Sequence, residues 1–210
     1  ATHIYCQRNK EFCAKMKLRR LTKQHVPWMV ELHADALAND LLPSFGQSFL
    51  SILHHEFIYS PHTIALGYVD GKQLQGFVVG TKNTSQFMRF VILKNLGRLL
   101  PIVILRCLAR PVLIKYLFQT LGYGKKIDAP SAELLIIVVE KLSQKQGVGT
   151  KLFKRLIREF NSLGINEFTV GTHANTPISN HFYRKLGGKL SYRTQLYDSL
   201  WNYYIFKTKL

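Results

Sequence analysis

The residues best suited to chemistry form a short glycine-bearing loop in the last third of the chain. An apolar run at 134–139 precedes the loop and an amphipathic run begins at Thr150, so we expect a strand, a turn and then a helix. Glycine lets the backbone approach a ligand closely, and a helix N-terminus adds unpaired N–H groups and positive potential. The pattern predicts a phosphate or pyrophosphate site made of Gln144, Lys145, Gln146, Gly147, Val148, Gly149 and Thr150.

Two familiar nucleotide-binding motifs do not fit this loop. A dinucleotide fingerprint has a third glycine, where this chain has Leu152. It also needs an acidic residue after the next strand, about 20 residues on, where the chain has Gly171, Thr172 and His173. A Walker loop needs Gly-Lys-Ser/Thr, which the sequence lacks.

The order Gln-x-x-Gly-x-Gly after a hydrophobic strand resembles the acetyl-CoA loop of the GNAT N-acetyltransferase superfamily. The resemblance continues at 168–173, expected to be a second buried strand, and from Asn175 to Gly188, which is similar to the family's Asn-x-x-Ala-x-x-x-Tyr-x-x-x-Gly-Phe segment. Ser179 stands where alanine is usual, and Gly188 replaces the aromatic residue. The resemblance covers 16–210 apart from one insertion and implies acetyl-CoA as acetyl donor.

The resemblance also implies roles for particular residues. The pantetheine arm of acetyl-CoA would pair like an extra strand beside Ile136, Ile137 and Val138, and Asn175 would contact the cofactor. Tyr183 would be the general acid that protonates the leaving thiolate. Packing in the core is the alternative interpretation of Tyr183.

Glu133 is the first candidate for the base that deprotonates an amine. It lies eleven positions before Gln144, the spacing found in family members with a strand glutamate. It begins an apolar run, where partial burial would make a carboxylate a stronger base. The alternatives are a solvent-facing Glu133, a water chain, and His173 as the base. No cysteine lies in these motifs, so we expect direct transfer in a ternary complex without a covalent intermediate.

Composition and charge limit the class of protein. The chain has 210 residues, enough for one domain with a buried core, and a formal net charge of +17. Three cysteines without close spacing support neither a disulfide framework nor a zinc site. The adjacent histidines at 54 and 55 would point in different directions on a helix and do not make a metal site. We therefore expect no metal. We expect a reducing, cytoplasmic location, with membrane association left open. Residues 1–15 are interpreted as an extension without a signal peptide.

The remaining elements follow the order of the GNAT fold. A strand is expected at 16–22, helices at 23–36 and 46–59, a hairpin of 63–69 and 73–81 around Asp70-Gly71, and a closing hairpin within 192–206. The fold class is then α/β: a mixed, mostly antiparallel sheet, splayed at a central parallel strand pair and flanked by helices, in one domain at 16–210.

Residues 82–128, called here the inserted segment, interrupt this order before the cofactor strand. Short helices are expected at 87–96, 99–109 and 112–121, separated by Gly97, Pro101 and Pro111, with no acidic residue between Asp70 and Asp128. Basic residues interrupt every window long enough to span a membrane. Three interpretations of 87–121 stay open: a lid over the acceptor pocket, a contact with a membrane or lipid-linked substrate, and a homodimer interface.

The resemblance implies acetyl-CoA-dependent N-acetylation. A small-molecule amine is the favoured acceptor, such as an amino sugar carried on a nucleotide, because a basic lid would bind phosphate. A protein or peptide amine is the alternative acceptor. The alternative of another class is a non-catalytic module that docks on an anionic membrane or nucleic acid; the inserted segment lacks a nucleic-acid-binding motif.

Overall fold

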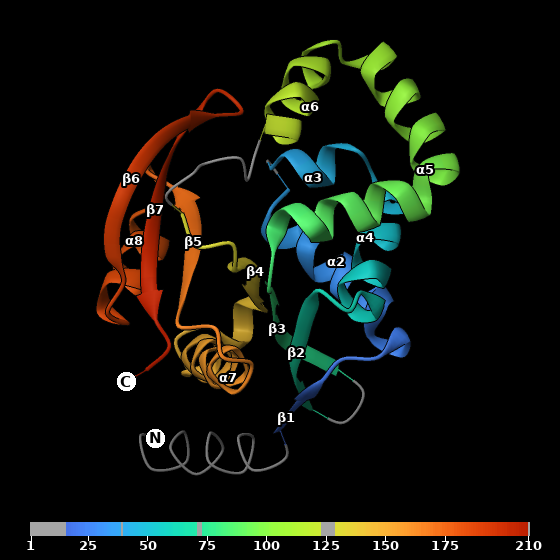
Figure 1. The fold of residues 1–210 in the computed structure, drawn as a ribbon. Helices are drawn as coiled ribbons and strands as arrows, with labels where there is room; N and C mark the ends of the chain where they lie inside the picture. The colour runs from blue at the N-terminus through green and yellow to red at the C-terminus, as the bar shows by residue number, and fades with distance from the viewer. Residues whose placement is uncertain (1–15, 39, 71–72, 123–128, 210) are drawn as a thin grey trace.

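The computed structural model describes residues 16–38, 40–70, 73–122 and 129–209. Seven strands form one sheet in the order β1-β2-β3-β4-β5-β7-β6 (Figure 1). Only the central β4–β5 pair is parallel among the strand pairs of these residues. The strands are β1 Met16–Arg20, β2 Thr63–Asp70, β3 Gln73–Thr81, β4 Glu133–Val139, β5 Glu167–His173, β6 Lys189–Leu196 and β7 Ser199–Lys207. The predicted mixed sheet is therefore confirmed.

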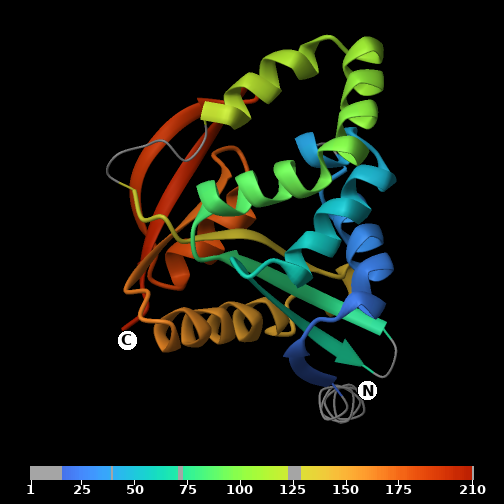
Figure 2. The same cartoon turned by 45° about the vertical axis from the view of Figure 1, so that its right-hand side comes forward.

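Helices cover both faces of the sheet, as Figures 1 and 2 show. The amphipathic α7 (Val148–Ser162) and α8 (Pro177–Lys185) pack on one face, where Leu152, Phe153 and Phe160 are buried against the strands. The other face carries α2 (Val26–Ala36), α3 (Leu41–Ser44), α4 (Gln47–Tyr59) and the first half of α5 (Thr84–Ala109).

The centre of the sheet is splayed. β4 and β5 pair only through Glu133↔Thr169 and Leu134↔Val170, at the start of β4. The β3–β4 register shifts at the next residue. Leu135 and Ile136 both pack toward the sheet face that carries α2, α4 and α5, as two successive residues do at a β-bulge. Beyond this bulge, the edge of β4 that faces β5 is open, which confirms the predicted splay.

The predicted N-terminal elements and the closing hairpin are confirmed. The first strand ends at Arg20, and the first helix opens with a 3₁₀ turn, Lys23–His25. β2 and β3 pair across the predicted turn, with a register shift between Tyr68 and Val69, and β6 pairs with β7. The turn residues 71–72, the extension 1–15 and part of the inserted segment, 123–128, lie outside the described residues.

The inserted segment differs from its prediction. The first two predicted helices correspond to α5, a 26-residue element with a break inside it, and the third corresponds to α6 (Val112–Gly122). Gly97 and Pro101 lie within the second half of α5 and do not break it. The break lies instead at Asn95, with φ −116° and ψ 16°, where the side-chain amide donates to the Val91 carbonyl at 3.2 Å. Gly97 and Pro101 are exposed, so water can solvate the carbonyl that the proline leaves unpaired.

Candidate active site

The predicted anion-binding loop is a turn that opens directly into α7. Gly147 has φ +81° and is the N-cap, and Lys145 has φ +59°. The Lys151 N–H donates to the Gly147 carbonyl at 3.0 Å, which begins the helical ladder. The amides of Gly147, Val148, Gly149 and Thr150 precede that ladder and have no carbonyl partner in the helix. No acidic residue lies in the first turn, so its positive potential remains available to an anion.

The two glutamines of the loop brace it from within. The Gln144 amide donates to the Val139 carbonyl at 3.0 Å, and the Gln146 amide donates to the Leu142 carbonyl at 2.7 Å. The loop also lies close to α8, because a Cβ built on Gly149 would stand 3.6 Å from the Phe182 ring. The end of β4, the loop and α8 therefore meet at one place.

The open edge of β4 offers main-chain groups to a ligand. The Glu140 N–H donates to Gln75 of β3 at 2.9 Å, so by alternation Ile136 and Val138 direct their main-chain groups toward β3. Ile137 directs its N–H and carbonyl into the gap between β4 and β5. Of the three residues predicted to pair with the pantetheine arm, Ile137 has the required orientation.

Glu133 lies at the point where β4 and β5 begin to part. Its side chain is 8% exposed, and its Oε2 accepts a hydrogen bond from Thr84 Oγ1 at 2.8 Å. It lines a pocket of 480 Å³ between the first turn of α5, the end of α6 and the β6–β7 hairpin. Other polar groups of this pocket come from Thr84, Gln119, Thr169, Tyr192 and Tyr203.

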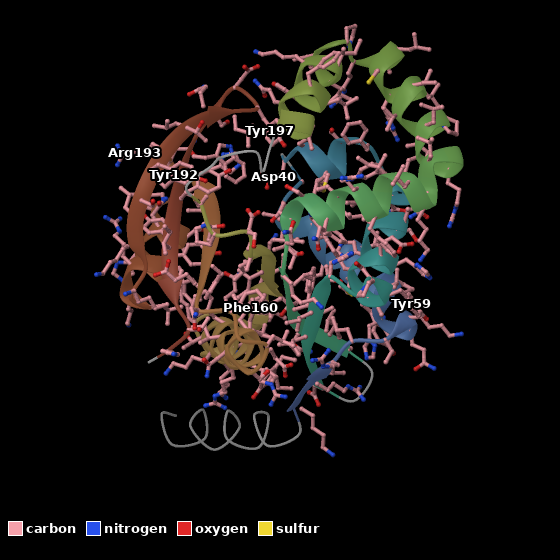
Figure 3. All side chains as sticks on the ribbon, in the orientation of Figure 1. Asp40, Tyr59, Phe160, Tyr192, Arg193 and Tyr197 are labelled. Atoms are coloured by element: carbon pink, nitrogen blue, oxygen red, sulfur yellow. The ribbon has the colours of Figure 1, made fainter. Side chains whose placement is uncertain are left out.

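Two tyrosines of the β6–β7 hairpin lie close enough to Glu133 for its carboxylate to raise their pKa values. Burial raises the pKa of Tyr192 to about 12, and the Glu133 carboxylate adds to the shift. Burial also raises the pKa of Tyr197, whose hydroxyl lies 2.9 Å from Thr120 Oγ1 of α6. Figure 3 shows both tyrosines in the part of the molecule where α6 approaches the hairpin. Both keep their protons near neutral pH.

Tyr183, the predicted general acid, lies on the other side of the sheet. Its side chain is 5% exposed in the apolar cluster under α7, with its ring near those of Phe153 and Tyr204. Burial raises its pKa, so the phenol is protonated near neutral pH. The structure therefore separates the two candidate catalytic residues: Glu133 faces the helices of one layer and Tyr183 those of the other.

Asn175 and Asn180 differ in their surroundings. Asn175 is exposed in the turn between β5 and α8, and Tyr183 follows it by eight positions, one more than in the family segment it resembles. Asn180 was not predicted as a site residue, yet it is 3% exposed and holds α8 in place. Its amide donates to the His173 and Thr176 carbonyls, and its Oδ1 accepts from Asn202 and Tyr204.

His173, the second candidate base, does not line the pocket of Glu133. It lies four positions along β5 from Thr169, the pairing partner of Glu133, a separation of about 13 Å along a strand. Its Nε2 is 3.3 Å from an Asp40 carboxylate oxygen, and its ring lies against Trp201 with centroids 4.0 Å apart. The contact between His173 and Asp40 joins β5 to the N-terminus of α3.

Within the described part of the chain, no three His, Cys, Asp or Glu side chains gather in a way that would hold a metal ion. His54 and His55 point to different surroundings: His54 is buried against His33, and His55 lies near Glu56. No helix of the described residues is long and apolar enough to cross a membrane.

Several solved structures share this fold. The ribosomal-protein-S18-alanine N-acetyltransferase of Escherichia coli aligns over 93% of this chain and 95% of its own, with a TM-score of 0.58 and 13% identity. An N-acetyltransferase from Staphylococcus aureus aligns over 92% and 99%, with a TM-score of 0.60 and 14% identity. The PaiA N-acetyltransferase of Thermoplasma acidophilum, in complex with coenzyme A, aligns over 90% and 97%, with a TM-score of 0.56 and 13% identity.

No curated protein matches the chain in sequence. The family model described as acetyltransferase (GNAT) family matches residues 34–188, which include the loop, β4, β5 and α8. Free amides at the start of α7 and an open β4 edge fit a donor with a pyrophosphate and an extended arm, which makes acetyl-CoA the donor. The chain belongs to the GNAT acetyltransferase family and is an N-acetyltransferase.

Proposed function

We propose that this enzyme acetylates a primary amine of a small molecule, with the acceptor held in the pocket beside Glu133. The observation that carries the proposal is the position of the Glu133 carboxylate, which is nearly buried in a 480 Å³ pocket at the point where the two central strands part. A buried carboxylate there can take a proton from an ammonium ion, which frees the lone pair of the nitrogen for attack on the thioester carbon.

Each step of transfer then has a residue. Acetyl-CoA, when bound, supplies a thioester carbon to the attacking amine. Glu133 accepts the amine proton, and an N–H of the open β4 edge stabilises the charge that develops on the carbonyl oxygen. The carbon–sulfur bond breaks as the carbon–nitrogen bond is completed, and the departing thiolate takes its proton from Tyr183, the donor that the family resemblance implies and that approaches from the other layer of helices. The first-turn amides of α7 hold the pyrophosphate.

The closure of the pocket supports a small acceptor over an extended peptide. Lys115 and Tyr116 of α6 bind the Asp198 carboxylate in the β6–β7 turn. Gln119 Oε1 accepts a hydrogen bond from the Tyr197 N–H at 2.9 Å, so α6 closes the side of the pocket that lies next to the β6–β7 turn. Tyr197 and Asp198 have φ of 51° and 58°, unfavourable for residues with side chains, and these contacts hold the turn in that conformation.

A basic neighbouring pocket supports an acceptor that carries phosphate. This pocket has a volume of 760 Å³ and shares Ala129, Pro130 and Ser131 with the Glu133 pocket. Lys82, Lys207 and Lys209 line it, together with Glu167. An amino sugar linked to a nucleotide would place its amine beside Glu133 and its phosphates beside these lysines.

The test is thiol release from acetyl-CoA with a panel of amines: nucleotide-linked amino sugars, free amino sugars, polyamines and peptides. We expect turnover with the nucleotide-linked sugars, and a fall in kcat of about 100-fold or more in Glu133→Gln. Glu31→Gln, at an exposed position of α2, is the control for loss of a carboxylate. The variant Lys207→Gln should raise KM for the nucleotide-linked sugar and leave kcat unchanged, whereas Lys189→Gln should change neither.

Two results would contradict the proposal. Turnover with peptides and none with small amines would make the enzyme a protein or peptide acetyltransferase. Binding of acetyl-CoA without turnover of any amine would favour the non-catalytic alternative.

A further inference from the structure

The outer part of the inserted segment exposes large apolar side chains. On the second half of α5, four of them recur at intervals of four residues, which aligns them along one side of the helix, and each is 49–76% exposed. Three more on α6 are 47–71% exposed. Figure 2 shows the second half of α5 and α6 as an arch that ends at the β6–β7 hairpin. The set is called the apolar face: Leu96, Leu100, Ile104, Leu108, Val112, Ile114 and Phe118.

The surroundings of the apolar face are basic. Residues 71–127 contain no Asp or Glu. Lys94 is paired with Glu56, and Lys115 with Asp198. Arg98 and Arg110 are exposed and make no ion pair within the described residues. Apolar side chains beside uncompensated arginines form the combination by which amphipathic helices bind the surface of anionic bilayers.

A second copy of the chain fits this surface poorly. A two-fold contact would bring the same face of both copies together. Arg98 and Arg110 of each copy would then approach those of the other without a carboxylate from 71–127 to offset them. Anionic phospholipids, in contrast, supply the opposite charge and a phase for the apolar side chains.

We propose that the apolar face docks this enzyme on anionic phospholipid bilayers, with the second half of α5 and α6 lying in the plane of the headgroups. The inference goes beyond the acetyl-transfer chemistry and does not require the proposed acceptor. The arginines contact the phosphates, and the leucines and Phe118 enter the boundary between headgroups and acyl chains.

The position of α6 connects this surface to the acceptor pocket. Tyr116, Gln119 and Thr120 face the pocket and the β6–β7 turn, whereas Ile114 and Phe118 of the same helix are exposed. Docking would therefore place the pocket about one helix diameter, roughly 10 Å, from the headgroups.

Co-sedimentation of the full chain with vesicles, without acetyl-CoA, tests the proposal. We expect binding to vesicles of phosphatidylcholine with phosphatidylglycerol, and little to phosphatidylcholine alone. The variant Leu100→Glu/Ile104→Glu, which changes side chains that are both 49% exposed, should bind at least about tenfold more weakly. The matched control is Leu163→Glu/Leu190→Glu, at 50% and 47% exposure away from the apolar face, and it should bind like the wild type.

The charged part of the surface has its own pair of variants. Arg98→Gln/Arg110→Gln should weaken binding to the anionic vesicles more than Arg158→Gln/Lys189→Gln, although both remove two positive charges. Equal losses would show that net charge attracts the protein and would overturn a specific docking face.

Two further results would overturn the proposal. One is failure of the wild type to bind anionic vesicles at physiological salt. The other is a wild-type dimer in analytical ultracentrifugation that Leu100→Glu/Ile104→Glu converts to a monomer without any loss of vesicle binding, because the face would then be an interface between copies. Thermal unfolding checks that each variant is folded. Acetyl-CoA binding is measured separately, so a failure to dock cannot be mistaken for a failure of the transfer chemistry.

Discussion

Replacing Gly147 with alanine tests whether the conformation of the loop, and not only its sequence, creates the acetyl-CoA site. Gly147 has φ +81° and is the residue from which α7 begins. A Cβ built at this position meets no atom within 4 Å. Any effect of the substitution must therefore come from the backbone conformation, or from the space that the ligand needs, and not from a clash within the protein.

The magnitude follows from the left-handed conformation. A residue with a side chain pays about 1–2 kcal/mol there, and alanine recovers about 0.4–1 kcal/mol by restricting the unfolded chain. The net loss of stability is about 1 kcal/mol, or roughly 2–4 °C in Tm for a chain of this size. If the free loop relaxes to escape this strain, Tm falls less, and binding must instead restore the strained conformation at a cost of about 1–1.4 kcal/mol, which weakens the Kd for acetyl-CoA about five- to tenfold. Asparagine, which tolerates the conformation better, should weaken it less.

Gly164 provides the control. It lies after the other end of α7, has φ +74°, and a Cβ there also meets nothing within 4 Å. Gly164→Ala should lower Tm at least as much as Gly147→Ala, and calorimetry should show an unchanged Kd for acetyl-CoA. Equal effects of the two substitutions on Kd would refute the assignment of the loop.

Three other measurements test the positions of individual residues. Tyr183→Phe keeps the buried ring but removes the proton, so kcat should fall at least about tenfold with the Kd for acetyl-CoA unchanged, whereas Tyr68→Phe should leave kcat near the wild-type value. Asn180→Ala leaves the buried hydroxyl of Tyr204 and amide of Asn202 without their acceptor, so urea unfolding should show a loss of about 3–4 kcal/mol, against nearly none for the exposed Asn161→Ala. Burial lowers the pKa of His33 to about 4 and that of His54 to about 3. The unfolded chain therefore binds protons below pH 6.5 that the buried native pair does not bind, and these two groups should lower the free energy of unfolding by roughly 5 kcal/mol between pH 7 and pH 4.5. A flat profile over this range would contradict a neutral buried pair.

The parts of the site that the sequence predicted are those encoded locally. Gly147 and Gly149, an apolar run before them and an amphipathic run after them fix a strand, a turn and a helix within 17 residues of Glu133. The splay of β4 from β5 was expected only from the family resemblance. Its local cause, the bulge at Leu135 and Ile136, has no sequence signal, because both residues look like ordinary strand residues.

The contacts that define the acceptor side were not predictable, since they join distant segments. Thr84 is 49 residues from Glu133, and Tyr192 follows Glu133 by 59 positions. Neither residue belongs to a motif, and only the folded chain brings them to one pocket. Asn180 could have been found from one weak sequence signal, because a polar residue on the otherwise apolar side of an amphipathic helix indicates a buried hydrogen-bonding role. The sequence predicts helix breaks at Gly97 and Pro101 because these residue types are strong helix breakers, whereas the break in α5 lies at Asn95, whose side-chain amide bonds the Val91 carbonyl.

α5 explains why the inserted segment serves the core and also leaves a face uncovered. Its buried residues Phe87, Val91, Asn95 and Leu99 recur every four positions, and the exposed apolar residues 96, 100, 104 and 108 form a second row with the same interval. The two rows differ by one position, or about 100° around a helix. The sheet and α4 can bury only one of them. Beyond Leu99, Ile102 still packs against the core, whereas the residues of the second row are 49–76% exposed. From Leu96 to Leu108 this apolar row extends over about three turns on a side of α5 that the core does not cover, which is why we assign it to a bilayer.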